Sequence, residues 1–325
     1  MDQPLVEIRD LRLQFRTYAG IVHALNGIDL EIDEQDMLGL VGETGCGKSM
    51  TGLAILRLVP RGGEIVSGSI RFRGEDLLTQ PESYMQQIRG ARIAMIFQDP
   101  TASLNPLFTI GQQIETVMGR HQRGDKGDMR ARALELLKIV ELPDPSRILG
   151  TYPHELSGGM KQRASIAIAL SCGADLLIAD EPTTDLDVTV QAQILDLLRR
   201  LRETQGVAIL MITHDLAVVA ETCRRVAVLY AGQVVESGLV DEVLFDAKHP
   251  YTRALLQASP KRSSRGRQLQ AIPGTVPSGL RPLQGCSFGP RCPQAMEVCL
   301  QPPLRVSVTS AHAVYCFLYD GSEER

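Results

Sequence analysis

The sequence has no strong charge of either sign and no long apolar run. Its 38 acidic and 34 basic residues leave a net charge of −4, whereas nucleic-acid-binding domains usually carry a strong basic field, so no nucleic-acid partner is expected. No apolar run approaches the roughly 18–20 residues that a membrane-spanning helix needs. The first residues, Met1 to Pro4, do not resemble a signal peptide. We therefore expect a cytosolic chain that can serve a membrane only as a peripheral subunit.

Strand and helix patterns alternate over the first 245 residues. This alternation predicts an α/β fold with a mainly parallel sheet that is covered on both faces. Short alternating strands over 5–40 predict an antiparallel β subdomain, and helix patterns over about 101–172 predict an inserted α-helical subdomain. Strand patterns lie at 6–9, 28–32, 37–41, 68–72, 92–97, 176–179, 207–212 and 226–230, and helix patterns lie at 49–58 and 133–140.

The composition changes after about residue 246. Prolines crowd this part of the chain, long periodic runs are few, and the basic stretch 261–267 is typical of a solvated linker. We therefore predict a first domain at 1–245 and a small cysteine-containing C-terminal extension at 246–325.

A glycine-rich loop stands between the strand pattern at 37–41 and the helix pattern at 49–58. It fits the complete phosphate-loop pattern in the context that this pattern requires. The glycines let backbone N–H groups curl around phosphates, the lysine neutralises β- and γ-phosphate oxygens, and the serine hydroxyl ligates Mg²⁺. Cys46 is either a small inert filler or a reactive thiol at a helix N-terminus. The nucleotide-binding residues predicted here are Gly42, Glu43, Thr44, Gly45, Cys46, Gly47, Lys48, Ser49 and Met50.

Two carboxylates follow the apolar strand pattern at 176–179. Asp180 would lie at the carboxyl end of that strand, where ligands of open α/β sheets bind, and it would hold Mg²⁺. Glu181 comes next and is the candidate general base for the attacking water. The alternative is that both carboxylates only cap the turn at Pro182.

A second anion site is predicted at Leu156-Ser157-Gly158-Gly159. Ser157 is a good helix N-cap, the two glycines expose the backbone, and a helix pattern follows from Met160. An uncovered helix N-terminus with a serine hydroxyl is suited to bind an anion. The chain therefore has two phosphate-binding surfaces but no internal repeat.

The order of these motifs resembles that of the ATP-binding cassette (ABC) family over residues 5–245. The resemblance implies an ABC-type phosphate-loop ATPase that binds ATP and Mg²⁺, with Ser49, Gln98 and Asp180 near the metal. It also implies that His214 contacts the γ-phosphate and that Tyr18, or alternatively Phe15, stacks on adenine. The remaining motif residues are Glu181, the catalytic glutamate, and Asp187, which links two cassettes across their interface.

In this family each ATP lies between two cassettes arranged head to tail. The resemblance therefore implies that Ser157 and Gly159 complete the ATP site of a neighbouring cassette and not the site that Lys48 begins. Because catalysis is mostly positioning and charge stabilisation, closure of the dimer would gate hydrolysis.

Four cysteines are concentrated near the end of the chain: Cys286, Cys292, Cys299 and Cys316. Disulfides are disfavoured in a reducing cytosol. A four-thiolate zinc site and a cubane iron–sulfur cluster are both compatible with four thiolates, and the spacing does not decide between them.

Two further motifs, at 249–255 and 285–293, resemble the C-terminal extension of oligopeptide/dipeptide ABC transporter ATPases. The resemblance implies a [4Fe–4S] cluster on the four cysteines, with zinc as the alternative. It further implies an ATPase subunit that drives import of di- or oligopeptides, at the cytoplasmic face of the inner membrane. The implied partners are two transmembrane permease subunits, a second and paralogous ABC ATPase, and a periplasmic or extracellular substrate-binding protein.

Other functions fit the same motifs less well. Importers of nickel, glutathione or murein peptides use similar ATPases, and this chain would not contact the cargo itself. Soluble ABC ATPases of DNA repair or translation usually fuse two cassettes or carry long coiled-coil insertions, neither of which is visible here.

Overall fold

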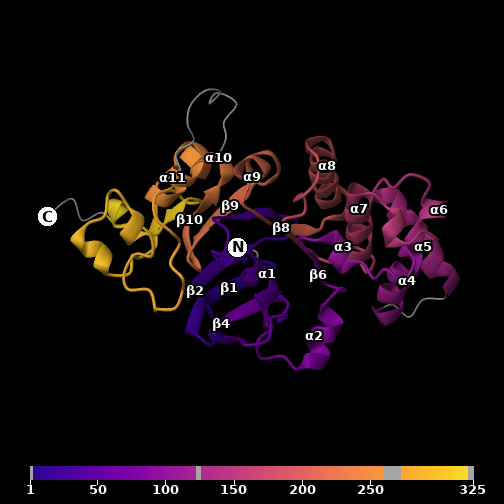
Figure 1. Ribbon diagram of the computed structural model, residues 1–325, viewed down its shortest axis with the longest axis horizontal. Helices are drawn as coiled ribbons and strands as arrows, with labels where there is room; N and C mark the ends of the chain where they lie inside the picture. The colour runs from indigo at the N-terminus through magenta and orange to yellow at the C-terminus, as the bar shows by residue number, and fades with distance from the viewer. Residues whose placement is uncertain (1–2, 122–125, 259–271, 321–325) are drawn as a thin grey trace. The chain divides into compact units, whose positions relative to one another are not determined.

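The computed structural model describes residues 3–121, 126–258 and 272–320. The chain forms two compact units (Figure 1). The first unit comprises Met1–Asp33, Met37–Leu78 and Ile212–Arg325, and the second comprises Glu34–Asp36 and Thr79–Met211. The chain returns from the second unit to the first within strand β8 (Ala208–Thr213). The predicted linker at 261–267 lies outside the described residues.

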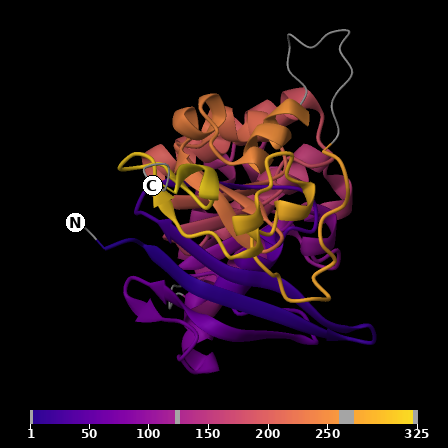
Figure 2. The same ribbon diagram turned by 90° about the vertical axis from the view of Figure 1, so that its left-hand side faces the viewer.

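The first unit contains a four-stranded antiparallel sheet in the order β2-β1-β4-β5. Its residues alternate between buried and exposed in β1, as expected for a sheet with one face on the core. Figure 2 shows β1 and β2 as the long pair of strands that a tight turn connects. The strands are β1 (Val6–Thr17), β2 (Gly20–Ile32), β4 (Gly63–Phe72) and β5 (Glu75–Asp76).

A second run of paired strands in the first unit has the order β11-β12-β10-β9-β3. β3 and β9 are parallel, and every residue of β3 is buried, which explains its continuous apolar sequence Met-Leu-Gly-Leu-Val. The strands are β3 (Met37–Val41), β9 (Arg225–Tyr230), β10 (Gln233–Leu239), β11 (Val306–Ser307) and β12 (Ala313–Val314). The helices of this unit are α1 (Lys48–Ile55), α9 (Leu216–Thr222), α10 (Val240–Phe245) and α11 (Pro250–Ala258).

The C-terminal part of the chain, which comprises the described residues 246–258 and 272–320, shares a hydrophobic core with β3 and β9. Tyr251 and Leu255 of α11 and Phe288 pack in one cluster with Val41 and Val228. The end of the chain also extends the sheet, because β12 pairs with β10. A segment around Gly279 lies beside β2 in both views (Figures 1 and 2), where its carbonyl accepts a hydrogen bond from the His23 N–H at 2.8 Å. The described residues of this part also form the 3-10 helices η3 (Gly289–Arg291), η4 (Glu297–Leu300) and η5 (Phe317–Tyr319).

The second unit combines parallel strands with a group of helices. β6 (Ile93–Ile96) and β7 (Leu176–Asp180) pair in parallel, and β8 is the next neighbour of β7. The buried Arg163 ties the helices together, since it donates to the Val140 carbonyl at 2.7 Å and to Gln193 at 3.3 Å. The helices are α2 (Glu82–Ile88), α3 (Pro100–Ser103), α4 (Ile110–His121), α5 (Lys126–Ile139), α6 (Pro145–Ile148), η1 (Pro153–Glu155), α7 (Gly158–Ala169) and α8 (Val188–Gln205).

The expected fold class is confirmed: parallel strands, a separate antiparallel sheet and a helical region are all present. The helix expected at 49–58 is shorter, because α1 ends at Ile55. The division into domains at residue 245 stays a prediction. Among the described residues, no helix is both long enough and apolar enough to cross a membrane.

Candidate active site

The glycine-rich loop occupies the connection between β3 and α1 in the first unit. Gly47 has φ of 109°, a left-handed conformation that side chains with a Cβ rarely adopt. A Cβ on Gly42 would lie 2.2 Å from the Leu229 carbonyl oxygen. The backbone conformation at Gly47 and the close contact at Gly42 therefore both require glycine. No side chain caps the start of α1 at Gly47, so the backbone amides of its first turn suit an anion such as phosphate.

Lys48 is buried and is oriented by the loop itself. The residue is only 6% exposed. The Nζ donates to the carbonyl oxygens of Gly42 at 2.7 Å and Glu43 at 3.1 Å. Ser49 follows as the second residue of α1. The loop thus combines amides, an ammonium group and a hydroxyl, which is a donor set that fits a nucleotide phosphate and its Mg²⁺.

Cys46 is enclosed by the same loop. Its residue is 1% exposed, and burial raises the pKa of its thiol. A protonated, buried thiol is a poor nucleophile. The structure therefore favours the interpretation of Cys46 as a small inert filler.

Glu181 and Gln98 come together in the second unit. Gln98 follows β6, and its Nε2 donates to Glu181 Oε2 at 3.2 Å. Thr184 Oγ1 donates to the same oxygen at 2.9 Å. Glu181 has φ of 47°, a strained conformation for a residue other than glycine, and such strain concentrates at functional sites. Asp180 lies at the carboxyl end of β7, as predicted, where it is the last residue of the strand and is buried.

The Leu156–Gly159 motif forms the start of α7. Ser157 is its N-cap, as predicted, and its Oγ accepts from the Met160 N–H at 3.4 Å. A Cβ on Gly159 would lie 2.6 Å from Val190 Cγ1, so this position needs glycine. The helix begins at Gly158, two residues before the predicted start, because both glycines already have helical geometry.

The other predicted residues have separate environments. Asp187 caps α8, where its Oδ1 accepts from the N–H groups of Thr189 and Val190, each at 3.0 Å. His214 directly follows β8 and is exposed. Tyr18 is fully exposed in the turn between β1 and β2, whereas Phe15 is half-buried and packs against Gly63. This contrast favours Tyr18 for adenine stacking, which stays a prediction.

The predicted [4Fe–4S] cluster is wrong. Among the residues that the structure describes, no group of three or more His, Cys, Asp or Glu side chains is arranged to hold a metal ion. The four cysteines line one apolar cavity of about 10 Å³, which is enough for about one water molecule. Burial raises the pKa values of the Cys286 and Cys292 thiols and raises that of Cys316 to about 11. The same absence of a metal-holding group among the described residues counts against the zinc alternative.

The sequence did not reveal what holds the phosphate loop. Glu43 was predicted only as one of the loop residues, but its N–H and its carboxylate both contact the C-terminal part of the chain. The N–H donates to Tyr251 Oη and the carboxylate pairs with Arg291. Both partners lie within the two motifs at 249–255 and 285–293, and those motifs were the available signal.

Comparison with known proteins identifies the class that this geometry defines. Residues 25–184 match the family "ABC transporter", and residues 235–299 match the family "Oligopeptide/dipeptide transporter, C-terminal region". The chain resembles the solved dimeric ATP-binding cassette MJ0796, in a post-hydrolysis state bound to ADP and Pi, with a TM-score of 0.65 and 29% identity. That alignment covers 72% of this chain and 98% of the other.

Relatives are similar over almost the whole length. The chain is 50% identical to a probable peptide ABC transporter ATP-binding protein, y4tR, of Sinorhizobium fredii, over 96% of this chain and 94% of the relative. It is 46% identical to the oligopeptide transport ATP-binding protein OppD of Bacillus subtilis, over 97% and 88%. A probable D,D-dipeptide transport ATP-binding protein of Escherichia coli, DdpD, is 47% identical over 93% of both chains. The chain belongs to the ABC transporter family of ATP-binding proteins, and it is an ATP-hydrolysing enzyme.

Proposed function

We propose that this chain hydrolyses ATP to drive the import of di- and oligopeptides, as the ATP-binding subunit of an ABC transporter. The observation that carries the proposal is the match of residues 235–299 to the C-terminal region of oligopeptide/dipeptide transporters. Relatives with peptide-transport names and at least 46% identity over nearly the whole chain support it.

In this proposal the phosphates of ATP lie against the loop at 42–50. Its amides and the Lys48 ammonium bind the phosphate oxygens, and Tyr18 stacks on adenine. Ser49, Gln98 and Asp180 hold the Mg²⁺, because hydroxyl, amide and carboxylate oxygens are the ligands that this ion prefers. When bound, Mg²⁺ neutralises charge on the β- and γ-phosphates.

The proposed general base is Glu181. Its Oε2 is oriented by Gln98 and Thr184, so the other carboxylate oxygen has a defined direction in which to accept a proton from the attacking water. His214 contacts the γ-phosphate. Phosphoryl transfer depends on positioning the attacking water and the γ-phosphate more than on covalent chemistry. A carboxylate whose direction is fixed by two neutral donors suits that requirement.

A second cassette completes each ATP site in this proposal. Ser157 and Gly159 at the N-terminus of α7 bind the γ-phosphate of a nucleotide that the partner's loop holds, and Asp187 lies at the interface between the cassettes. Support comes from α7 itself, a helix of 12 residues whose N-terminal amides favour an anion. We infer that the partner cassette is a paralogue and that two permease subunits and a substrate-binding protein complete the transporter. The chain then lies on the cytoplasmic face of the inner membrane.

Reconstitution tests the proposed cargo. The chain, its partner cassette and the two permeases are placed in proteoliposomes with the binding protein and ATP, and uptake of a radiolabelled dipeptide is measured. We expect uptake that depends on ATP and disappears with Lys48→Ala. Stimulation of ATP hydrolysis by nickel, glutathione or a murein peptide, with none by di- or oligopeptides, would contradict peptide import.

A further inference from the structure

The phosphate loop is braced by two side chains that come from the C-terminal part of the chain. Tyr251 belongs to α11 and Arg291 to η3, and each contacts Glu43, the second residue of the loop. Neither side chain has a part in the proposed chemistry of ATP. The two motifs that contain them therefore need a separate explanation.

Tyr251 gives a fixed acceptor to the loop backbone. Its Oη accepts a hydrogen bond from the Glu43 N–H at 2.9 Å. The residue has no exposed surface, and its ring packs on Tyr230 and Phe288, with centroid distances of 4.6 and 5.4 Å. The packed rings hold the hydroxyl in place, so the Glu43 amide has a partner whether or not a nucleotide is bound.

Arg291 holds the Glu43 carboxylate in a two-pronged ion pair. Nη1 donates to Oε2 at 2.8 Å and Nη2 donates to Oε1 at 3.2 Å. The Arg291 side chain is only 5% exposed. Its Nε donates to the Pro273 carbonyl at 2.8 Å, and Nη1 donates to Tyr230 Oη at 3.2 Å. A planar guanidinium with partners on each nitrogen is rigid, so it fixes the carboxylate in direction as well as in position.

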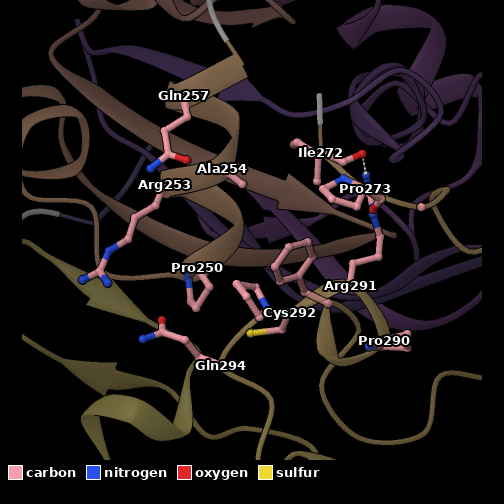
Figure 3. Close-up of a pocket in the computed structure, with 13 residues that line it drawn as sticks. Pro250, Arg253, Ala254, Gln257, Ile272, Pro273, Pro290, Arg291, Cys292 and Gln294 are labelled. Atoms are coloured by element: carbon pink, nitrogen blue, oxygen red, sulfur yellow. Dashed lines mark hydrogen bonds between the residues drawn. The ribbon is translucent and has the colours of Figure 1, made fainter. Parts of the chain in front are cut away.

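The close-up in Figure 3 shows where this arginine stands. Arg291 reaches toward the backbone of Ile272 and Pro273 at one side of a cavity of about 910 Å³. Phe288 and Cys292 line the same cavity. The guanidinium therefore connects the wall of this cavity with the phosphate loop.

Glu43 also contacts Lys48, the phosphate-binding lysine of the loop. Its carbonyl oxygen accepts from Lys48 Nζ at 3.1 Å and from the Cys46 N–H at 3.2 Å. The N–H, the carbonyl and the carboxylate of Glu43 are thus all held. Pairing with Arg291 also neutralises a carboxylate that would otherwise repel the phosphates of ATP.

We propose that Tyr251 and Arg291 are positioning residues for ATP: acting through Glu43, they hold the phosphate loop and the Lys48 ammonium in the geometry that receives the phosphates. The C-terminal part of the chain is then needed for full nucleotide affinity. This inference rests on ATP binding by the family and not on the cargo. Nucleotide binding is measured separately from transport, so a failure of peptide import and a failure of this inference are distinguishable.

The first test removes a single oxygen atom. Tyr251→Phe keeps the packed ring but leaves the Glu43 N–H without its acceptor, so we expect the affinity for a fluorescent ATP analogue with Mg²⁺ to fall about fivefold. The matched control is Tyr319→Phe in the full-length chain. The Tyr319 hydroxyl also accepts in the C-terminal part, from Arg253 Nη2 at 2.7 Å. This control should leave nucleotide affinity unchanged.

The second test is a double-mutant cycle on the ion pair. Arg291→Gln leaves the Glu43 carboxylate unpaired beside the phosphate site, and we expect about a tenfold loss of ATP affinity. Adding Glu43→Gln should recover part of that loss, because it removes the unpaired charge. Arg291→Lys should bind ATP more tightly than Arg291→Gln but more weakly than the unmodified chain, because an ammonium cannot reproduce the two-pronged contact. Arg253→Gln is the matched control.

A kinetic measurement separates positioning from simple loss of structure. In the assembled transporter, KM for ATP should rise in Tyr251→Phe and Arg291→Gln while kcat at saturating ATP stays within about twofold, since bound phosphates restore the loop geometry. Melting temperatures of all variants accompany these data. If Arg291→Gln does not fold, the ATP affinities of Tyr251→Phe and of the Glu43→Gln single variant are compared with those of the controls instead. Losses of affinity no larger than those of the Tyr319 and Arg253 controls would overturn the inference.

Discussion

Glu181 combines a strained backbone with a fixed carboxylate. Its φ of 47° costs free energy that the surrounding structure must offset. In return, Gln98 and Thr184 both donate to Oε2 and set the direction of the other oxygen. Such an arrangement suits a group that must accept a proton from one particular water molecule.

Glu181→Gln should therefore abolish hydrolysis while ATP still binds. An amide cannot accept the proton, so we expect kcat to fall at least about 100-fold. Turnover is measured by phosphate release in the assembled transporter, and binding by retention of ATP. Glu203→Gln, which removes an exposed carboxylate on α8 paired with Arg202, is the control. Hydrolysis by Glu181→Gln at more than about a tenth of the normal rate would contradict the role of general base.

His249 is a second residue whose environment determines its chemistry. It is buried, and its Nδ1 accepts a hydrogen bond from the Tyr251 N–H at 3.1 Å, directly before α11. Burial lowers its pKa to about 3. The folded protein thus keeps the imidazole neutral, while the unfolded chain takes up a proton below its ordinary pKa of about 6.5.

Stability should fall as the pH falls through this window. Between about pH 6.5 and 3 the unfolded state binds more protons at this site, so the free energy of unfolding decreases by at most about 1.4 kcal/mol per pH unit. His249→Asn keeps an acceptor at the start of α11 and removes the titration. We expect its melting temperature to change less between pH 7 and 5 than that of the unmodified chain, with replacement of the exposed His154, His154→Asn, as the control. Identical pH profiles for His249→Asn and the unmodified protein would exclude this cause.

At the scale of elements, Glu236 connects β10 with the C-terminal part of the chain. Its fully buried carboxylate accepts from the N–H groups of Lys248 and His249 at 2.6 and 3.0 Å, and it contacts His312 Nε2 at 2.8 Å. β12, which follows His312, pairs with β10 at the same place. One side chain therefore joins β10 to the residues just before α11 and to His312, which lies 76 residues further along the chain.

Glu236→Gln should loosen this junction. A neutral amide presents only one acceptor oxygen to these donors. We therefore expect the free energy of unfolding of the first unit to fall by about 3 kcal/mol, which is measured as a drop of several degrees in the melting temperature. Glu64→Gln, which breaks an exposed pair with Arg16, should change stability by less than about 0.5 kcal/mol. Equal melting temperatures for the two variants would show that Glu236 is not the anchor.

The α7 helix offers a test that separates stability from function. Ser157→Ala removes the N-cap hydroxyl, which costs about 1 kcal/mol of stability. If Ser157 also contacts the γ-phosphate of a partner's nucleotide, ATP hydrolysis in the assembled transporter should fall at least about tenfold. Asp144→Ala removes a comparable cap from α6 and serves as the control. Similar hydrolysis rates in the two variants would exclude a contact with nucleotide.

At the scale of the whole molecule, the proposed active site needs a second cassette. The Glu181→Gln chain, mixed with its partner cassette, should elute as a two-cassette complex in the presence of ATP and Mg²⁺ and as separate chains without them. The reason is that unhydrolysed ATP bridges the loop of one cassette and α7 of the other. Light scattering on the eluted peaks measures the mass. Separate chains at saturating ATP would argue against a shared site.

Much of the fold followed from local patterns in the sequence. The continuous apolar runs at 37–41 and 176–179 form β3 and β7, because such runs are stable only when they are buried on both faces. The helix from Met160 was predicted two residues too late, since Gly158 and Gly159 do not signal helix by themselves. The resemblance of the C-terminal motifs implied a [4Fe–4S] cluster on the four cysteines, but neither the motifs nor the spacing along the chain reveals how the thiols are arranged in space.

The sequence by itself determined the phosphate loop, the carboxylates at the carboxyl end of β7 and the serine cap of α7, because each depends on neighbours within a few residues. Only the tertiary structure decided that Tyr251 and Arg291 hold Glu43. These partners are separated from it by 208 and 248 residues. Such contacts form when a shared core brings α11 and Phe288, the residue before η3, against β3 and β9. A motif fixes local backbone geometry, whereas packing across the whole chain selects the side chains that hold the motif in place.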